Sequence, residues 1–90
     1  MKYVIFKKQI GDSVQFHPII SAEHTTHSRI KYDEPGYNVH SAGFFFLKDG
    51  MVRVDEKRIS ESLMIGPQPE DQVLLTAVLL NAGSYGFIKY

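Results

Sequence analysis

The chain has 90 residues, enough for one small domain with a core but too few for two. Ten Lys and Arg balance ten Asp and Glu, which argues against holding a nucleic-acid backbone or an anionic membrane through the overall field. The 43% apolar content is typical of a globular protein, and the lack of Cys excludes disulfides, thiol nucleophiles and Cys-type zinc sites.

The N-terminal region predicts two strands. Residues 2–8 are rich in Tyr, Val, Ile and Phe, which favour β-structure. Gly11-Asp12 then indicates a turn into a second strand over residues 13–17. A two-residue loop would place Lys7 opposite Phe16, so we expect a longer loop or a β-bulge.

Two apolar runs are candidates for a secretory signal or a membrane-spanning segment, and both are too short. The run at residues 3–6 is too short for a secretory signal, and no small-residue cleavage site follows it. The longest apolar stretch, residues 73–80, is interrupted by Thr76 and is too short to span a bilayer. We therefore expect a cytoplasmic protein without a membrane segment.

Residues 18–37 are polar and give few structural signals. Ser21 is a candidate N-cap for a short helix over residues 22–27, although Thr and His are poor helix formers. Glu34-Pro35-Gly36-Tyr37 predicts a type II turn, with Gly36 in the position that needs a positive φ. The stretch is either a short helix or a binding loop, because binding residues often lie in irregular segments of this length.

The clearest hairpin is built on Asp49-Gly50, a sequence that favours a type I′ turn. Its arms are residues 39–48 and 51–55, and this register pairs Leu47 with Val52 and Phe45 with Val54 on one face. The other face carries a second set: His40, Phe44, Phe46, Met51 and Arg53. Since both faces are apolar near the turn, both need a cover.

The sequence after the second hairpin predicts one more strand, followed by the helix with the clearest sequence signals. Residues 55–58 form a charged break, and residues 59–65 are expected to form a strand with Ile59, Glu61, Leu63 and Ile65 on one face.

A helix is predicted over residues 69–82. Pro69 suits its first position, acidic residues follow at the positive end of the dipole, and an apolar stripe continues at helical spacing. Residues 81–83 provide a C-cap, and residues 84–90 are expected to supply a short last strand or a tail on the sheet.

Four histidines are the first candidates for chemistry: His17, His24, His27 and His40. His24 and His27 are three residues apart, which would place them on one helical face as paired metal ligands sometimes are. The sequence has no His-Glu-x-x-His motif and no acidic residue at a diagnostic offset, so we expect no metal or other cofactor. It also lacks Gly-x-Ser-x-Gly, and we expect no enzymatic activity.

Binding of nucleic acid or phosphate has little support in the pattern. Cations beside the aromatic strand are interleaved with Asp49, Asp55 and Glu56, so no basic stripe forms. A Gly-rich loop before a helix is absent, and Glu70 and Asp71 would repel an anion from the start of the predicted helix.

Two kinds of contact surface follow. The face with His40, Phe44, Phe46, Met51 and Arg53 is expected to form a homodimer or partner contact, unless residues 18–30 supply a second cover. The alternative function is sequestration of a small ligand or nucleotide with residues 17–40 as the pocket wall. The candidate ligand-binding residues are His17, His24, His27, Arg29 and Tyr37.

Short motifs spread over most of the chain carry a resemblance. They are Ser41-Ala42-Gly43-Phe44, Ser60-Glu61-Ser62-Leu63 and Pro69-Glu70-Asp71, after the N-terminal Tyr-Val-Ile-Phe strand. In this order the chain resembles small uncharacterised proteins of bacteriophages and prophages. The resemblance implies an accessory protein that binds and diverts a host protein, or that neutralises a defence system or its signalling molecule. It transfers no functional residue.

The whole chain, residues 1–90, is therefore predicted to be a single α+β domain. We expect a four- or five-stranded, mainly antiparallel sheet with the helix at 69–82 packed on one face. The leading function is non-enzymatic binding through protein–protein contacts, as a homodimer that engages another protein.

Overall fold

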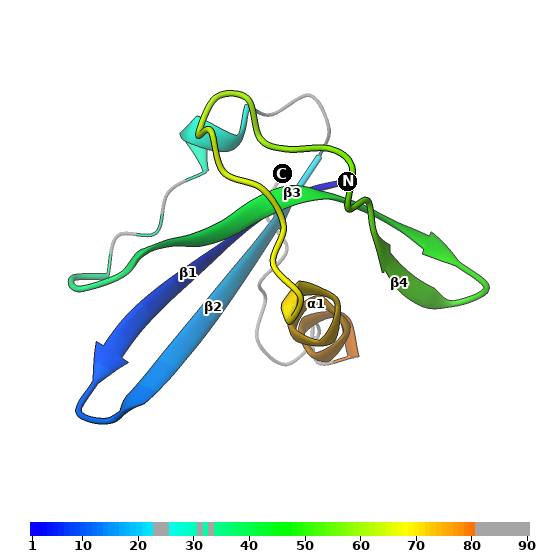
Figure 1. The fold of residues 1–90 in the computed structure, drawn as a ribbon. Coiled ribbons are helices and arrows are strands. Elements are labelled where there is room, and N and C mark those ends of the chain that lie inside the picture. The colour runs from blue at the N-terminus through cyan, green and yellow to red at the C-terminus, as the bar shows by residue number, and fades with distance from the viewer. Residues whose placement is uncertain (23–25, 31, 33, 81–90) are drawn as a thin grey trace.

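The computed structural model describes residues 1–22, 26–30, 32 and 34–80. A four-stranded antiparallel sheet in the order β2-β1-β3-β4 is followed by the helix α1, as Figure 1 shows. The elements are β1 (Lys2–Ile10), β2 (Ser13–Ser21), the short 3₁₀ helix η1 (His27–Arg29), β3 (Asn38–Lys48), β4 (Met51–Val54) and α1 (Asp71–Leu80). The predicted α+β class is confirmed.

The first hairpin differs from our expectation. Ile10 pairs with Ser13, so the loop has two residues, and Lys7 does lie opposite Phe16. Gly11 adopts a φ of 59°, as the first central residue of a type II′ turn requires. The apolar-against-charged pair is tolerated because it lies in the half of the hairpin nearer the turn, where Lys7 is exposed and Phe16 half-buried.

The second hairpin is as predicted. Phe45 pairs with Val54 and Leu47 with Val52. Asp49 and Gly50 have φ values of 53° and 77°, and two positive values in succession define a type I′ turn. Figure 1 shows the end of this hairpin projecting from the sheet as a two-stranded ribbon.

A β-bulge in β3 changes the side on which His40 lies. Ile5 pairs with Ser41 and Phe6 with Val39, so His40 is an extra residue opposite no single partner. Its ring contacts Phe16 edge-on at a centroid distance of 4.9 Å. His40 therefore faces the helix side with Ser41, and the prediction that it shares the face of Phe44 is wrong.

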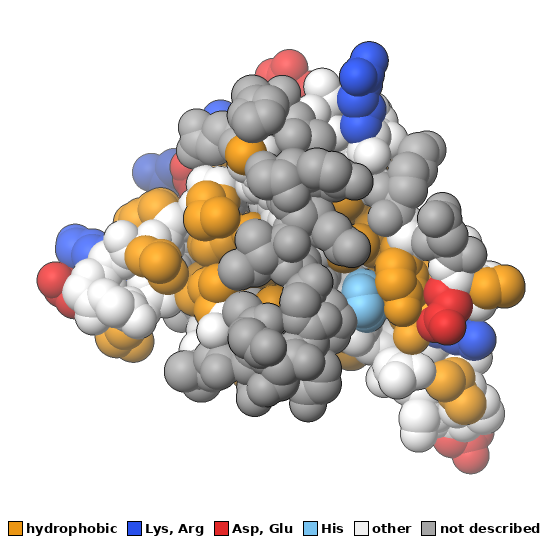
Figure 2. Space-filling model, turned by 180° about the vertical axis from the view of Figure 1, so that it is seen from behind, with side chains coloured by type: hydrophobic (Ala, Val, Ile, Leu, Met, Phe, Trp, Pro, Cys, Tyr) orange, Lys and Arg blue, Asp and Glu red, His pale blue; other side chains and the backbone are white. Residues whose placement is uncertain are grey.

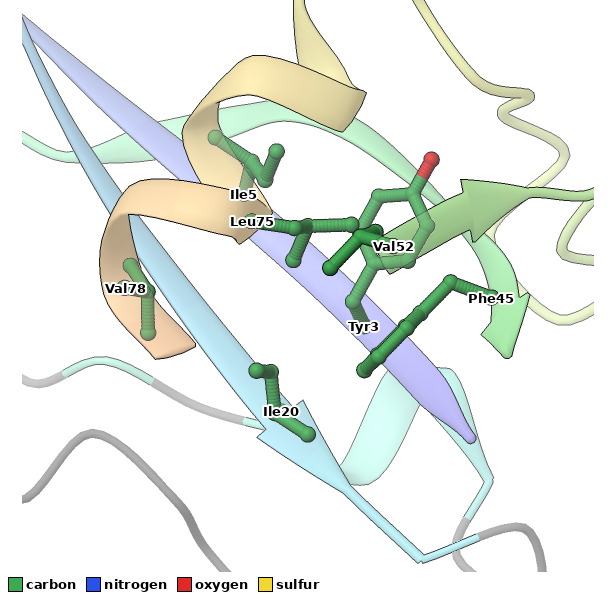
Figure 3. Packing of buried hydrophobic residues seen from close by; sticks show 7 residues of the cluster. All are labelled: Tyr3, Ile5, Ile20, Phe45, Val52, Leu75 and Val78. Atoms are coloured by element: carbon green, nitrogen blue, oxygen red, sulfur yellow. The ribbon is translucent and has the colours of Figure 1, made fainter. Parts of the chain in front are cut away.

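One face of the sheet packs against α1. The buried cluster joins side chains from all four strands of the sheet and the helix, with Leu75 inserted over the strands as Figure 3 shows. Its members are Tyr3, Ile5, Ile20, Phe45, Val52, Leu75 and Val78. All seven are less than one-tenth exposed, so this is the main core of the domain.

The opposite face has a second cover made of irregular chain. Val4, Phe6 and Ala42 form a buried cluster with Ile30, against which Leu63 packs. The loop after β4 runs back across the sheet toward η1 (Figure 1), and the Ser28 amide donates to the Ser62 hydroxyl oxygen at 3.2 Å. Residues 18–30, expected as the alternative cover, thus contribute Ile30 and η1 over the central part of this face, and the loop after β4 supplies Leu63 and Ile65.

The strand expected over residues 59–65 is wrong. A single bridge joins Ser60 to Ile65, and the residues between them form a turn. Met64 has a φ of 57°, which no strand accommodates, and its side chain is 79% exposed. The alternation of apolar residues here reflects a loop that packs the partly buried Leu63 and Ile65 against the sheet, not a pleated strand.

The remaining predictions concern segment ends. The helix begins at Asp71, two residues after the predicted start, and the predicted C-cap at 81–83 and last strand at 84–90 lie outside the described residues. Ser21 ends β2, and residues 23–25 of the expected short helix also lie outside the described part. Within that part, no helix combines the length and apolarity needed to cross a bilayer.

Candidate functional site

A hollow lies on the face opposite α1, at the corner where β1, η1 and the loop after β4 meet. It is a groove of about 570 Å³, within the range of sites that hold small molecules. Its lining is mostly polar and includes three positively charged side chains; the lining residues are Lys2, Thr26, His27, Phe44, Lys57, Arg58, Ile59, Glu61 and Ser62. We call this the cationic groove.

The cationic groove is organised around Phe44. The guanidinium carbon of Arg58 lies 3.6 Å from the centre of this ring, and the Lys2 ammonium lies 5.6 Å from it. Both are cation–π contacts, so one aromatic ring positions two cations of the groove lining. The turn at residues 55–58 presents Arg58, since its amide donates to the carbonyl of Asp55 at 3.3 Å.

His27 forms the buried wall of the cationic groove. Its ring is 3% exposed, stands edge-on to Phe44 at 5.0 Å, and donates from Nε2 to the carbonyl of Gly43 at 2.8 Å. Burial lowers the pKa of His27, and the nearby charges of Lys2 and Arg58 lower it further. The imidazole is therefore neutral at pH 7, and its hydrogen bond fastens η1 to β3.

The charges of the groove are unequal in number. Among the described residues, no carboxylate forms an ion pair with Lys2, Lys57 or Arg58. Glu61 is the single acidic residue in the lining, so the groove has a surplus of two positive charges. A positive potential in a partly enclosed hollow attracts anions.

A second polar cluster lies inside the main core, where Asp71 accepts three hydrogen bonds. The Tyr3 hydroxyl donates to Oδ2 at 2.6 Å, the Ser41 hydroxyl to Oδ1 at 2.8 Å, and the Gln68 amide to Oδ2 at 2.9 Å. Burial, and then the hydrogen bond to Asp71, raise the pKa of Tyr3 far above its ordinary value. With Asp71, Tyr3 and Ser41 all fully buried, this cluster joins helix to sheet and offers no access to a substrate.

The start of α1 also holds His40. Its Nε2 is hydrogen-bonded to Oε1 of Glu70, a partly exposed residue that directly precedes the helix. The Glu70 backbone amide, and then His40, lower the pKa of the Glu70 carboxyl. His40 is thus a link between β3 and α1 rather than part of an interface on the opposite face.

The candidate ligand-binding residues fall into separate places. His27 lines the cationic groove, whereas His17 stacks on Tyr32 at 3.9 Å and Tyr37 packs against Tyr32 at 4.8 Å. Arg29 is exposed outside both groups, and His24 lies outside the described residues. The structure therefore does not bring the predicted ligand set together into one site.

The candidate interface residues are also divided. Phe44 is half-buried beneath Arg58 and His27, so it is not available as an open contact. Phe46 and Met51 are 51% and 53% exposed at the end of the ribbon, where Arg53 is also exposed.

Leu47, which points to the other side of the ribbon, is 58% exposed. Figure 2 shows hydrophobic side chains at the end of the molecule where the ribbon lies, with charged side chains beside them.

The cationic groove does not follow from the sequence pattern. Lys2 and Arg58 are far apart in the chain, and their meeting depends on how the loop after β4 crosses the sheet. The one relevant signal in the sequence is the charged break at residues 55–58, which contains Lys57 and Arg58. Within the described residues, no group of three or more His, Asp or Glu is placed to hold a metal ion.

Comparisons with known protein families, with curated proteins and with solved structures give no match to this chain. What bears on function is therefore the geometry of the exposed ribbon and of the cationic groove.

Proposed function

We propose that this chain is a small non-enzymatic binding protein whose projecting β3–β4 ribbon contacts a second protein molecule, a second copy of the same chain. The observation that carries the proposal is the exposure of large apolar side chains on both faces of one ribbon, Phe46 and Met51 on one and Leu47 on the other. Phe, Met and Arg are enriched where proteins bind one another. A ribbon of two strands is also marginal by itself, and a partner would stabilise it.

The charges on the ribbon favour a second copy as the partner. Lys48 and Asp49 lie side by side at the turn, and Arg53 lies on the same strand pair as Phe46. A two-fold contact places one patch against itself, so a patch with both signs of charge is complementary to its own copy. The zero net charge of the chain adds no repulsion between two copies.

The resemblance to small phage proteins supports a further part of this proposal. The dimer would present its remaining surface to a host protein and divert that protein from its normal role.

The oligomeric state tests the ribbon contact directly. Light scattering after gel filtration should give about twice the 10.2 kDa mass of one chain. Phe46→Asp should give a folded monomer, because the charge is buried in the contact but solvated in the single chain. The matched control is Val14→Asp, which places the same charge at a 44% exposed apolar site on β2 and should leave the dimer intact.

Circular dichroism and urea unfolding show whether the Phe46 variant is folded. Phe45→Ala is the opposite control, since Phe45 is 1% exposed and its truncation should lower the free energy of unfolding by about 3–5 kcal/mol. A wild-type monomer at micromolar concentration would refute the dimer, as would a Phe46 variant that stays dimeric.

A further inference from the structure

The cationic groove lies away from the exposed ribbon tip and is not used by the proposed function. Its lining joins the start of β1, η1 and the loop after β4, and its three cations outnumber its one carboxylate. Positive side chains that share a hollow repel one another. Such an arrangement is stabilised when an anion occupies the space between the charges.

Arg58 is held in a position suited to an anion. Its guanidinium lies on the face of Phe44 at 3.6 Å, and this contact leaves the N–H donors at the edge of the guanidinium available. A planar guanidinium held in this way donates two parallel hydrogen bonds to a phosphate or carboxylate. The Lys2 ammonium beside the same ring adds a second charge to the same space.

Hydroxyl groups complete the polar lining. The Ser62 oxygen accepts a hydrogen bond from the Ser28 amide at 3.2 Å, which fixes the oxygen and leaves its own proton to be donated. Thr26 lies on the same lining and is exposed. The groove therefore presents donors of three kinds: guanidinium, ammonium and hydroxyl.

We propose that the cationic groove binds a small ligand through a phosphate group, with Arg58 and Lys2 as its principal contacts. A phosphate monoester carries nearly two negative charges at pH 7, which matches the surplus of two positive charges in the lining. Recognition by aromatic stacking is not the basis of binding, because Phe44 is already covered by Arg58 and the His27 ring is buried. The pKa of His27, lowered by burial and by Lys2 and Arg58, is consistent with an uncompensated positive potential here.

Glu61 allows the dependence of binding on the charge of the groove to be tested. Its carboxylate lies in the lining and opposes the charge of the ligand. Glu61→Gln should therefore strengthen binding several-fold, while Arg58→Gln should weaken it by roughly tenfold or more. A general effect of surface mutation would not move the affinity in these two opposite directions.

The experiment is an NMR titration of the full chain with inorganic phosphate, adenosine monophosphate and adenosine, followed through backbone amides. Phosphate and the monophosphate should shift the amides of Ser62 and Ile59, and adenosine should shift neither. Similar affinity for the two anions means that the groove recognises the phosphate group alone. Tighter binding of the monophosphate means that the attached group also contributes, and both results support the proposal.

Matched variants separate this site from the ribbon. Arg53→Gln removes an exposed cation from the ribbon and should leave phosphate affinity unchanged. Phe46→Asp should also leave it unchanged, so failure of the dimer and failure of the groove are distinguishable. The proposal is overturned if neither anion shifts these amides, if adenosine binds as well as its monophosphate, or if folded Arg58→Gln binds phosphate as the wild type does.

Discussion

The carboxylate of Asp71 joins the helix to the sheet through three donors. Tyr3 comes from β1, Ser41 from β3 and Gln68 from the segment before α1, so three distant parts of the chain meet at one buried charge. A buried carboxylate is costly unless its oxygens are hydrogen-bonded, and here both are. The arrangement fixes the position of the first turn of α1 over the strands.

Tyr3→Phe tests this link at the level of one oxygen atom. The ring still fills its place in the core, but Asp71 loses a donor, and a hydrogen bond to a charged group contributes about 1.5–3 kcal/mol. We expect the free energy of unfolding in urea to fall by about 2 kcal/mol. The control is Tyr32→Phe, which removes a hydroxyl from an exposed contact with Glu34 and should change stability by less than about 0.5 kcal/mol. Equal losses in the two variants would contradict the assignment.

The turn of the second hairpin depends on the backbone conformation of one residue, Gly50. Gly50 has a φ of 77°, and a Cβ there would meet no atom within 4 Å, so its requirement for glycine is purely conformational. Gly50→Ala should lower the free energy of unfolding by about 1 kcal/mol. Gly50→Asn should lose less, because Asn tolerates this conformation better. Urea unfolding of both variants checks this, and an Ala variant as stable as the wild type would refute it.

Elements specified by nearby residues could be predicted from the sequence. Asp49-Gly50 determines its own turn and hence the Phe45–Val54 register, and Pro69-Glu70-Asp71 begins a helix within two residues of the expected place. The bulge at His40 could not be predicted, because it depends on how β1 and β3 align across the sheet. The cationic groove was missed for the same reason: its charges come from strands and loops that meet only after the chain has folded.

The domain as a whole has one sheet with two unlike covers, a helix on one face and irregular chain on the other. His27 contributes to the irregular cover while buried and neutral, with its pKa lowered. As the pH falls below the ordinary value of about 6.5, the unfolded chain binds a proton that the folded chain does not. The contribution of His27 to the free energy of unfolding is therefore fully present above about pH 6.5. It is lost as the pH falls from there through the lower pKa that His27 has in the folded chain.

His27→Gln should remove this part of the pH dependence, since Gln can donate to the Gly43 carbonyl without titrating. Urea unfolding between about pH 7 and pH 5 should show a smaller decrease in stability for the variant than for the wild type. The range avoids the titration of Glu70, whose pKa is lowered and whose contribution is lost only at more acidic pH. Identical slopes for the two proteins would mean that His27 titrates alike in the folded and unfolded states.

The bulge in β3 makes the chain one residue longer at His40 than the ladder of pairs requires. Deleting His40 would leave Val39 opposite Phe6 and Ser41 opposite Ile5, and every side chain would stay on its own face of the sheet. Deleting Ala42 instead would exchange the inward and outward sides of the strand around it. Strand β3 can therefore change its length at one position without a change of fold, with the link to Glu70 as the contact that is lost.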